Sequence, residues 1–218
     1  MKILHTTDLH FNKRWYSWIE KNQEKVDVIC ITGDFFNTAS DFIVQFSLFE
    51  QAYWIKEWFK KIYKPILICS GNHDIVEKSI ASENHLPNKN IKEYDEGYLL
   101  KNIKNPNVYN DGSIVSLNGI IFGCIPYNCD SFDDYKKCNI ILHHLPPKNT
   151  LTSMGEKEDL GSEEIKAAII SGKIKPQYIL SGHIHDPKEK MITFLEIKIS
   201  NPGFIRGQKK PCNIILSL

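Results

Sequence analysis

Short aliphatic runs alternate with longer amphipathic segments in the first third of the chain. Strands are expected at residues 2–7, 26–32 and 65–69. Segments 14–24 and 41–61 carry aromatic and aliphatic side chains at helical spacing, and Ser40 or Asp41 is in position to cap the second helix. This βαβαβ order favours a parallel sheet in an α/β protein.

The second half of the chain is richer in hairpin signals. Asn118-Gly119 lies between two apolar runs and is typical of a tight hairpin turn. Further strands are expected at 108–112, 139–142, 177–181, 191–200 and 212–218, and a helix at 163–171. The polar segment 148–161 is predicted to be an exposed loop. The two halves together suggest two packed sheets with helices outside.

The composition and net charge are those of an ordinary globular protein. The chain has 218 residues, 42% hydrophobic, with a net charge of +1, which is typical of a globular protein and gives no support to a nucleic-acid or membrane partner. We expect one domain over residues 1–218. No apolar run approaches the ~18 residues of a membrane span, and the first residues do not resemble a signal peptide. Six cysteines without a CxxC pair indicate buried free thiols and a cytoplasmic location.

Residues of the kinds that bind metals follow five of the expected strands. They are Asp8 and His10, Gly33 and Asp34, Gly71 to Asp74, His143 and His144, and Gly182 to His185. Open α/β folds build their sites where the carboxyl ends of strands meet, so these side chains are expected to converge. Six of the eight histidines belong to this set, whereas His5 and His85 are interpreted as ordinary structural residues.

The donor types indicate the class of metal. Carboxylate, imidazole and amide donors without thiolates suit Mn, Fe or Zn. Seven candidate ligands exceed the needs of one ion, and a shared carboxylate would allow two ions about 3.5–4 Å apart. Such an arrangement is suited to in-line attack on phosphorus.

The ordered set DLH, GD, GNHD, HLPP and GHIH resembles the calcineurin-like metallophosphoesterase superfamily. The resemblance extends from Asp8 to His185, and GSEEI (161–165) and NPGF (201–204) are similar to a small single-domain branch. It implies an α/β fold, a four-layer αββα sandwich of two mixed β-sheets flanked by helices. It also implies a phosphomonoesterase or phosphodiesterase in which water bridging two divalent ions, with Mn expected first, attacks a small phosphorylated substrate.

The resemblance also implies a role for each motif residue. The first ion would be held by Asp8, His10 and His185; the second by Asn72, His144 and His183; and Asp34 would bridge both. His73 would be the general acid that protonates the leaving group. Asp74 would orient His73.

The histidine pair leaves two alternatives. The end of the strand at Leu142 favours His143 as the ligand, whereas the spacing of a ligand histidine, one variable residue and a proline favours His144. We select His144 on the motif spacing. Asn37 stands where many members carry a second aspartate that is not a direct ligand, so a change outside the ligand set is expected there.

Two other functions are compatible with the motifs. One is a DNA nuclease similar to the SbcD-type repair family, although this chain is short and nearly neutral. The other is a non-catalytic scaffold of the same fold, which the presence of His73 disfavours. Segments 75–106 and 148–161 are expected to form the substrate pocket, while Trp15, Trp18, Trp54 and Trp58 are expected to pack in the core.

Overall fold

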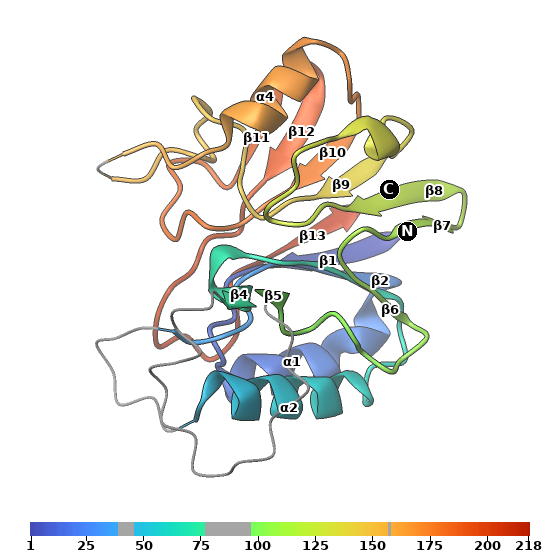
Figure 1. Cartoon of the computed structure of the whole chain (residues 1–218), viewed down its shortest axis with the longest axis vertical. Helices are drawn as coiled ribbons and strands as arrows, with labels where there is room; N and C mark the ends of the chain where they lie inside the picture. The colour runs from blue at the N-terminus through green and yellow to red at the C-terminus, as the bar shows by residue number, and fades with distance from the viewer. Residues whose placement is uncertain (39–45, 77–96, 157) are drawn as a thin grey trace.

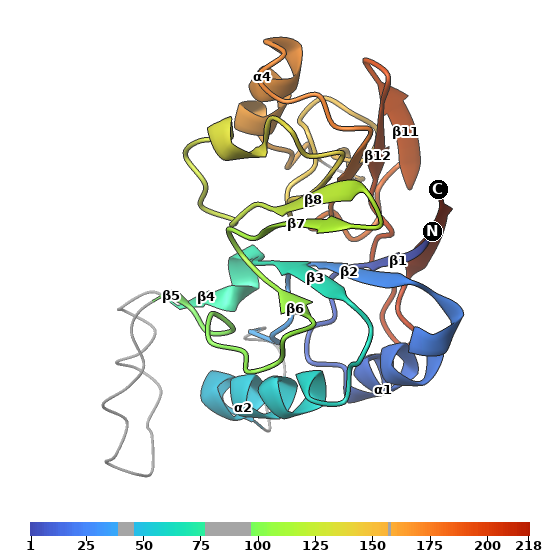
Figure 2. The same ribbon diagram turned by 90° about the vertical axis from the view of Figure 1, so that its right-hand side faces the viewer.

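The structure is a computed structural model that describes residues 1–38, 46–76, 97–156 and 158–218. Two β-sheets lie face to face in the middle of the molecule, and helices cover their outer faces (Figure 1). The view turned by 90° shows the same layers, with α1 and α2 below one sheet and α4 above the other (Figure 2). The predicted αββα sandwich is therefore confirmed.

The first sheet has five strands in the order β13-β1-β2-β3-β6. Its members are β1 (Lys2–Thr6), β2 (Val28–Thr32), β3 (Ile66–Cys69), β6 (Val108–Tyr109) and β13 (Asn213–Ser217). The first four run parallel, and β13 pairs antiparallel with β1. The predicted βαβαβ unit forms the centre of this sheet.

The second sheet has six strands in the order β11-β12-β10-β9-β8-β7. They are β7 (Ile114–Leu117), β8 (Ile120–Cys124), β9 (Ile140–Leu142), β10 (Tyr178–Leu180), β11 (Met191–Phe194) and β12 (Ile197–Ser200). Hairpins form its two antiparallel edges, and its centre is parallel. A separate two-stranded ribbon joins β4 (Ile75–Val76) to β5 (Gly97–Tyr98).

The described helices begin at polar caps. They are α1 (Lys13–Asn22), α2 (Leu48–Phe59) and α4 (Glu163–Ile170), with short 3-10 turns at Gln23–Lys25, Asn72–Asp74 and Asp133–Tyr135. The sequence predicted the second helix from residue 41, whereas α2 begins at Leu48, where Ser47 and Glu50 form a capping box. The proposed caps Ser40 and Asp41 lie outside the described residues.

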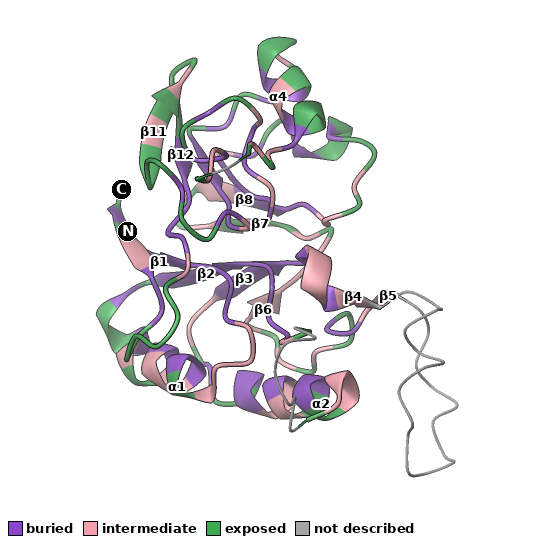
Figure 3. Cartoon of the chain, turned by 90° about the vertical axis from the view of Figure 1, so that its left-hand side faces the viewer, coloured by how far each residue is buried: buried purple, intermediate pink, exposed green. Residues whose placement is uncertain are grey.

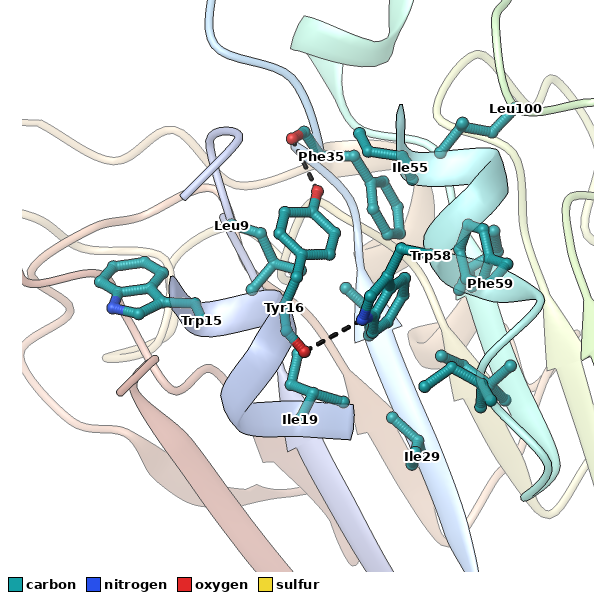
Figure 4. Packing of buried hydrophobic residues seen from close by; sticks show 14 of the residues in the cluster. Leu9, Trp15, Tyr16, Ile19, Ile29, Phe35, Ile55, Trp58, Phe59 and Leu100 are labelled. Atoms are coloured by element: carbon teal, nitrogen blue, oxygen red, sulfur yellow. Dashed lines mark hydrogen bonds between the residues drawn. The ribbon is translucent and has the colours of Figure 1, made fainter. Parts of the chain in front are cut away.

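Apolar side chains fill the space between the layers. Figure 3 shows that the central strands are buried while the helices expose one face. Figure 4 shows the cluster between the first sheet and its helices, where Trp58 Nε1 donates to the Tyr16 carbonyl and the Tyr16 hydroxyl donates to the Phe35 carbonyl (3.0 and 2.9 Å). Trp15 and Trp58 are buried, and Trp18 and Trp54 are partly buried against this cluster, as predicted.

Two hairpin turns differ in how well the sequence predicted them. Asn118 and Gly119 both have positive φ (50° and 80°), which confirms the predicted tight turn between β7 and β8. Residues 191–200 were predicted as one strand, but they form a second hairpin. Its turn uses Leu195 and Glu196 at positive φ (48° and 68°), two residue types that give no turn signal.

The segment 148–161 was predicted to be an exposed loop, and this prediction was wrong for its middle. Thr152 and Ser153 are fully buried. Local hydrogen bonds satisfy the polar groups there: the Thr150 hydroxyl donates to the Pro147 carbonyl (2.7 Å), and the Ser153 hydroxyl donates to the Thr150 carbonyl (2.9 Å). A polar composition therefore did not imply exposure.

All six cysteines are free thiols, as predicted, and all except Cys129 are buried. Cys30, Cys69 and Cys124 lie in the core between the two sheets. His5 also lies there, where its ring nitrogens contact the hydroxyl oxygens of Ser200 and Thr32 (2.8 and 3.1 Å), so its structural interpretation is confirmed. Among the described residues, no helix is long and apolar enough to cross a membrane.

Candidate metal centre

The metal-ligand residues meet where strands of both sheets end. The five strand ends were expected to converge, and they do so from two sheets: β1, β2 and β3 belong to the first sheet and β9 and β10 to the second. Backbone hydrogen bonds join the loops within each sheet, from Asp8 N to the Gly33 carbonyl (3.1 Å) and from Gly182 N to the His144 carbonyl (2.8 Å). The His183 N–H donates to Asp8 Oδ2 (3.1 Å) and connects the two sheets.

Four of these residues have a left-handed backbone although none is glycine. The φ angles are 52° at Asp8, 39° at His10, 55° at Asp34 and 67° at His183. Each such conformation costs about 1–3 kcal/mol and persists where surrounding structure enforces it, typically at functional sites. These residues are four of the nine non-glycine residues with positive φ in the described structure, and a fifth, Phe11, directly follows His10.

The first ligand cluster comprises Asp8, His10 and His185. Asp8 Oδ1 lies 3.4 Å from His185 Nε2 and 3.8 Å from His10 Nε2, and the two imidazole nitrogens are 3.1 Å apart. The other carboxylate oxygen of Asp8 accepts a hydrogen bond from the Thr7 hydroxyl (2.6 Å). Asp8 Oδ1 is buried and has no hydrogen-bond partner in the described structure. A cation among these three side chains would satisfy that oxygen.

The second cluster comprises Asp34, His144 and His183. His144 Nε2 lies 3.4 Å from Asp34 Oδ2. Asn72 joins this group, since its Oδ1 lies 3.1 Å from His144 Nε2 and 3.0 Å from His183 Nδ1. His144 Nδ1 donates to the Thr32 carbonyl (2.7 Å), which leaves the lone pair of Nε2 directed into the cluster.

The structure separates the two histidines that the sequence left as alternatives. His144 lies in the second cluster, whereas His143 Nδ1 donates to the Leu145 carbonyl (2.8 Å). The His143 ring packs edge-on against Phe132, with ring centroids 6.1 Å apart. The geometry therefore favours His144, which the motif spacing selected, over His143, which the end of the strand favoured.

Asp34 lies between the two clusters. It also groups with His10 and His73, and its Oδ2 lies 3.8 Å from His73 Nε2. The His73 ring is partly exposed, and its Nδ1 contacts the Thr38 hydroxyl. His73 therefore directs Nδ1 toward Thr38 and Nε2 toward the carboxylate of Asp34.

Asp74 does not orient His73 in this structure. Its carboxylate accepts backbone N–H groups from Asp34 (2.8 Å), Gly71 (2.8 Å), Phe35 (2.7 Å) and Phe36 (3.3 Å). No described hydrogen bond joins it to His73. Burial and the charge of Asp34 raise the pKa of Asp74, while the backbone donors act in the opposite direction because they stabilise the carboxylate. Its geometric role is to hold the loop that carries Asp34.

Burial and mutual charge set the protonation of the centre. Burial is the largest single influence on Asp34 and would raise its pKa, but the charge and hydrogen bond of His144 together with the charges of His73 and His10 hold that pKa below its usual value. Burial lowers and Asp34 raises the pKa of His144, with a net rise to about 9. Burial and the charge of His144 lower the pKa of His183 to about 4. His183 is therefore neutral at pH 7, whereas His144 carries a proton that a bound cation would displace.

Two glycines allow the loops to approach closely. Gly33 has φ +82°, and a Cβ there would lie 2.5 Å from His144 Nδ1. A Cβ on Gly182 would lie 1.8 Å from the Thr7 hydroxyl oxygen. Any larger residue at either position would push the ligand loops apart.

A cavity of about 410 Å³ opens beside the clusters. Its lining includes the imidazoles of His10, His73 and His185 and the side chains of Trp15, Phe204 and Arg206. Asn37, a departure from the family pattern, also lines it. Of the two segments predicted to form the pocket, the described residues of 148–161 do not line this cavity, and 77–96 of the other segment lies outside the described structure.

Sequence reasoning missed Phe204 and Arg206 as pocket residues, and it assigned Trp15 only to the core. The NPGF motif was a usable signal for Phe204, because it was part of the family resemblance. Thr7, which holds Asp8, was also missed; a hydroxyl beside a candidate ligand carries little signal on its own. The residues present fit a metal: an unpartnered buried carboxylate oxygen, borderline donors and enforced strain all converge there.

Comparisons with known proteins bear on the family and the fold of this chain. The family model for calcineurin-like phosphoesterases matches residues 1–187. One crystal structure has a TM-score of 0.60 at 12% identity, covering 93% of this chain and 90% of its own, and shows the same fold. No curated protein matches at a significant level.

Two further solved structures are similar over almost the whole chain. One is a conserved uncharacterized protein, a predicted phosphoesterase from Streptococcus pneumoniae TIGR4 (TM-score 0.45, 13% identity, covering 99% of this chain and 83% of its own). The other is Yfce, a phosphoesterase from E. coli (TM-score 0.46, 15% identity, covering 100% of this chain and 88% of its own).

Proposed function

The chain belongs to the calcineurin-like phosphoesterase family, and from this premise we propose that it is a binuclear metal-dependent hydrolase of small phosphomonoesters or phosphodiesters. The observation that carries the proposal is the position of Asp34. Its carboxylate belongs to one ligand group with His144 and His183 and to another with His10 and His73. His10 also belongs to the first cluster, so Asp34 reaches both clusters, and a carboxylate between two clusters is the geometry that a two-metal site requires.

The proposed ligand sets follow the two clusters. Asp8, His10 and His185 would hold one ion, Asn72, His144 and His183 the other, and Asp34 both. Oxygen and imidazole donors without thiolates support Mn, with Fe or Zn as alternatives. When bound, the ions would supply Lewis acidity and lower the pKa of the water that attacks phosphorus.

His73 is proposed as the general acid. It lines the cavity and is partly exposed there, so it can reach the substrate oxygen that leaves. Its contact with the Thr38 hydroxyl engages Nδ1, which makes Nε2 the nitrogen for proton donation. The proton would pass from Nε2 to the leaving oxygen as the P–O bond breaks.

The cavity, the site residues and the thiols support three further expectations. A volume of about 410 Å³ suits a small phosphorylated molecule, which supports this partner class over a nucleic-acid duplex. The presence of His73 together with a complete ligand set supports an enzyme over a scaffold. Six free cysteines support a cytoplasmic location.

The test is metal reconstitution followed by a substrate panel. Metal-free protein is incubated with Mn, Fe or Zn, freed of excess metal, and analysed for ions per chain. Hydrolysis of phosphomonoesters and phosphodiesters is measured on the same samples. We expect two ions per chain and activity that follows occupancy. A chain that binds one ion or none in excess Mn contradicts the binuclear centre.

A further inference from the structure

The NPGF segment, residues 201–204, follows β12 directly and lies against the loop that carries His183. Asn201 is fully buried. Its side-chain amide donates to the carbonyls of Gly182 (2.9 Å) and Ile184 (3.2 Å), the residues on either side of His183. One side chain therefore holds the backbone before and after a candidate ligand.

The same segment also holds the backbone of His185. The Phe204 N–H donates to the His185 carbonyl (2.7 Å). Gly203 permits this approach, because its φ is +74° and a Cβ there would lie 2.7 Å from the His185 carbonyl oxygen. The turn itself is fixed, since the Gly203 N–H donates to Asn201 Oδ1 (2.9 Å). Both candidate ligands of the loop, His183 and His185, are thus anchored by the NPGF segment.

The ring of Phe204 adds contacts to the first ligand cluster. Its centroid lies 4.5 Å from that of His185, with the ring planes tilted by 38°, and 5.1 Å from that of His10, with the planes at 82°. Its third described ring contact is with Trp15, at 5.3 Å. The ring therefore limits the rotation of two first-cluster imidazoles, and among the described residues it has no ring contact with the second cluster.

The loop held by the NPGF segment serves both clusters. His185 belongs to the first cluster and His183 to the second. His183 has a φ of 67°, a left-handed conformation that persists only where its surroundings enforce it. The bonds from Asn201 to the neighbouring carbonyls are such surroundings. An ion that binds a loop already held in its binding geometry loses no affinity to the ordering of that loop.

We propose that the NPGF segment positions the ligands of both ions: Asn201 strengthens the binding of both, and Phe204 strengthens the binding of the first ion alone. The inference rests on the proposed function, because it takes the two clusters as the two ion sites. Asn201 acts through the backbone of the ligand loop and is a positioning residue. Phe204 also lines the cavity, so metal affinity rather than activity is the measurement that isolates its action on His10 and His185.

Asn201→Ala tests the anchor, and Asn105→Ala is its matched control. Asn105 also precedes a proline, its amide donates to the carbonyls of Phe59 (2.6 Å) and Ile62 (2.9 Å), and its Oδ1 accepts the N–H two residues on (2.9 Å). These bonds hold the chain after α2 and involve no candidate ligand. Metal-free protein is titrated with Mn by calorimetry, after denaturant unfolding has shown each variant to be folded. Asn201→Ala should weaken both sites by about 10–100-fold, and Asn105→Ala should weaken neither.

Phe204→Ala tests the ring and does not depend on the buried amide. It should weaken the first site about tenfold and leave the second unchanged, because its imidazole contacts are with the first cluster. Phe204→Leu keeps apolar contact with these imidazoles and should weaken the first site less. His185→Asn and His183→Asn, each lacking a ligand of one cluster, identify which site a variant has weakened.

The outcomes separate this inference from the proposed function. Wild-type affinity for Mn in both Asn201→Ala and Phe204→Ala overturns the positioning role, as do equal losses of affinity in Asn201→Ala and Asn105→Ala. If Asn201→Ala does not fold, the Phe204 pair decides: weakening of both sites equally, or of neither, overturns the inference. Each of these results leaves the proposed function intact while the wild type binds two ions and hydrolyses phosphoesters. Wild-type protein that binds fewer than two ions, or hydrolyses no phosphoester with two bound, overturns the proposed function instead.

Discussion

The carboxylate of Asp34 lies 3.4 Å from Nε2 of His144, although the two residues follow strands of different sheets. At this contact the carboxylate of Asp34, from the first sheet, interacts with an imidazole from the second sheet. Because Asp34 also groups with His10, a change in this carboxylate should affect both ligand clusters.

Asp34→Asn should therefore lower the occupancy of both ions, because it removes a charged donor from each cluster. Metal content per chain after reconstitution measures the effect. Asn37→Ala is the control, since Asn37 lines the cavity but belongs to neither cluster. The loss of metal affinity or activity in Asn37→Ala should stay within the ~10–100-fold range that is typical when a residue contacting a metal ligand is changed. Equal damage from both substitutions would contradict the role of Asp34.

His73→Asn should leave both ions bound and reduce the rate by about 10²–10⁴-fold, the range typical of general acids. The loss should be largest for alkyl phosphates, whose leaving oxygen must be protonated, and small for nitrophenyl phosphate. His183→Asn is the matched contrast, because it removes a ligand and should impair every substrate together with metal content. Loss of metal in His73→Asn would make His73 a ligand.

Asp74→Asn should destabilise the fold more than it alters the chemistry. In the wild type, backbone N–H groups donate to both oxygens of the Asp74 carboxylate. In the variant the NH₂ group of the amide replaces one of these oxygens and cannot accept. Each backbone donor left without an acceptor costs roughly 1–3 kcal/mol of stability. Denaturant unfolding of the metal-free protein measures this cost, with Asp134→Asn at an exposed position as control. A stable variant that reproduces the leaving-group pattern of His73→Asn would show instead that Asp74 orients His73.

The contribution of Asp111 to stability should fall as pH rises from about 4 to about 6. Burial raises the pKa of this carboxyl to about 6, and the Ser70 hydrogen bonds only partly oppose it. At this group the folded state binds more protons than the unfolded state, so its contribution is greatest below the window and is lost as pH rises through the folded pKa. The difference corresponds to about 3 kcal/mol. The buried His143 and His183, whose pKa values are lowered to about 4, contribute with the opposite sign.

Asp111→Asn should remove this contribution, so stability should rise more steeply, or fall less, between pH 4 and pH 7 than in the wild type, which denaturant unfolding at the two pH values measures. The amide oxygen can still accept from the Ser70 N–H, so the variant isolates the titration. Asp130→Asn, at an exposed position, should leave the slope unchanged. A wild-type slope retained in Asp111→Asn would assign the effect to another group.

Binding to DNA should be weak and fall at least tenfold between about 50 and 200 mM salt, because contacts to phosphates release counterions. The net charge of +1 provides no broad basic surface. Fluorescence anisotropy with labelled single-stranded and duplex DNA measures this. Tight binding that resists salt, with processive degradation, would favour the nuclease alternative.

Local signals predicted much of the fold and the ligand set. Strands β1, β2 and β3 were readable because buried parallel strands are continuous apolar runs, and the residues after them stood out against that pattern. Asn118-Gly119 was readable because both residues tolerate positive φ. His144 was selected by spacing from Pro146, and the structure places it in the second cluster.

Interactions between distant segments were not readable in the same way. Asp74 accepts N–H groups from a loop forty positions earlier, and a carboxylate beside a histidine in sequence does not reveal that partner. Leu195 and Glu196 form a turn because β11 and β12 pair around them, which overrides their local preference. Phe204 reaches the cavity only because Asn201 anchors its segment to the His185 loop.

The hydrogen bond from His183 N to Asp8 Oδ2 joins residues 175 positions apart. Such separations delay folding, since the entropy of closing a long loop opposes the contact until the rest of the structure supports it. During synthesis from the N-terminus, Asp8 and Asp34 emerge long before His183. A nascent chain can thus form β1 to β3 early without a complete ion site. With ligands contributed as proposed, full ion occupancy would report the docking of the second sheet, which carries His144, His183 and His185.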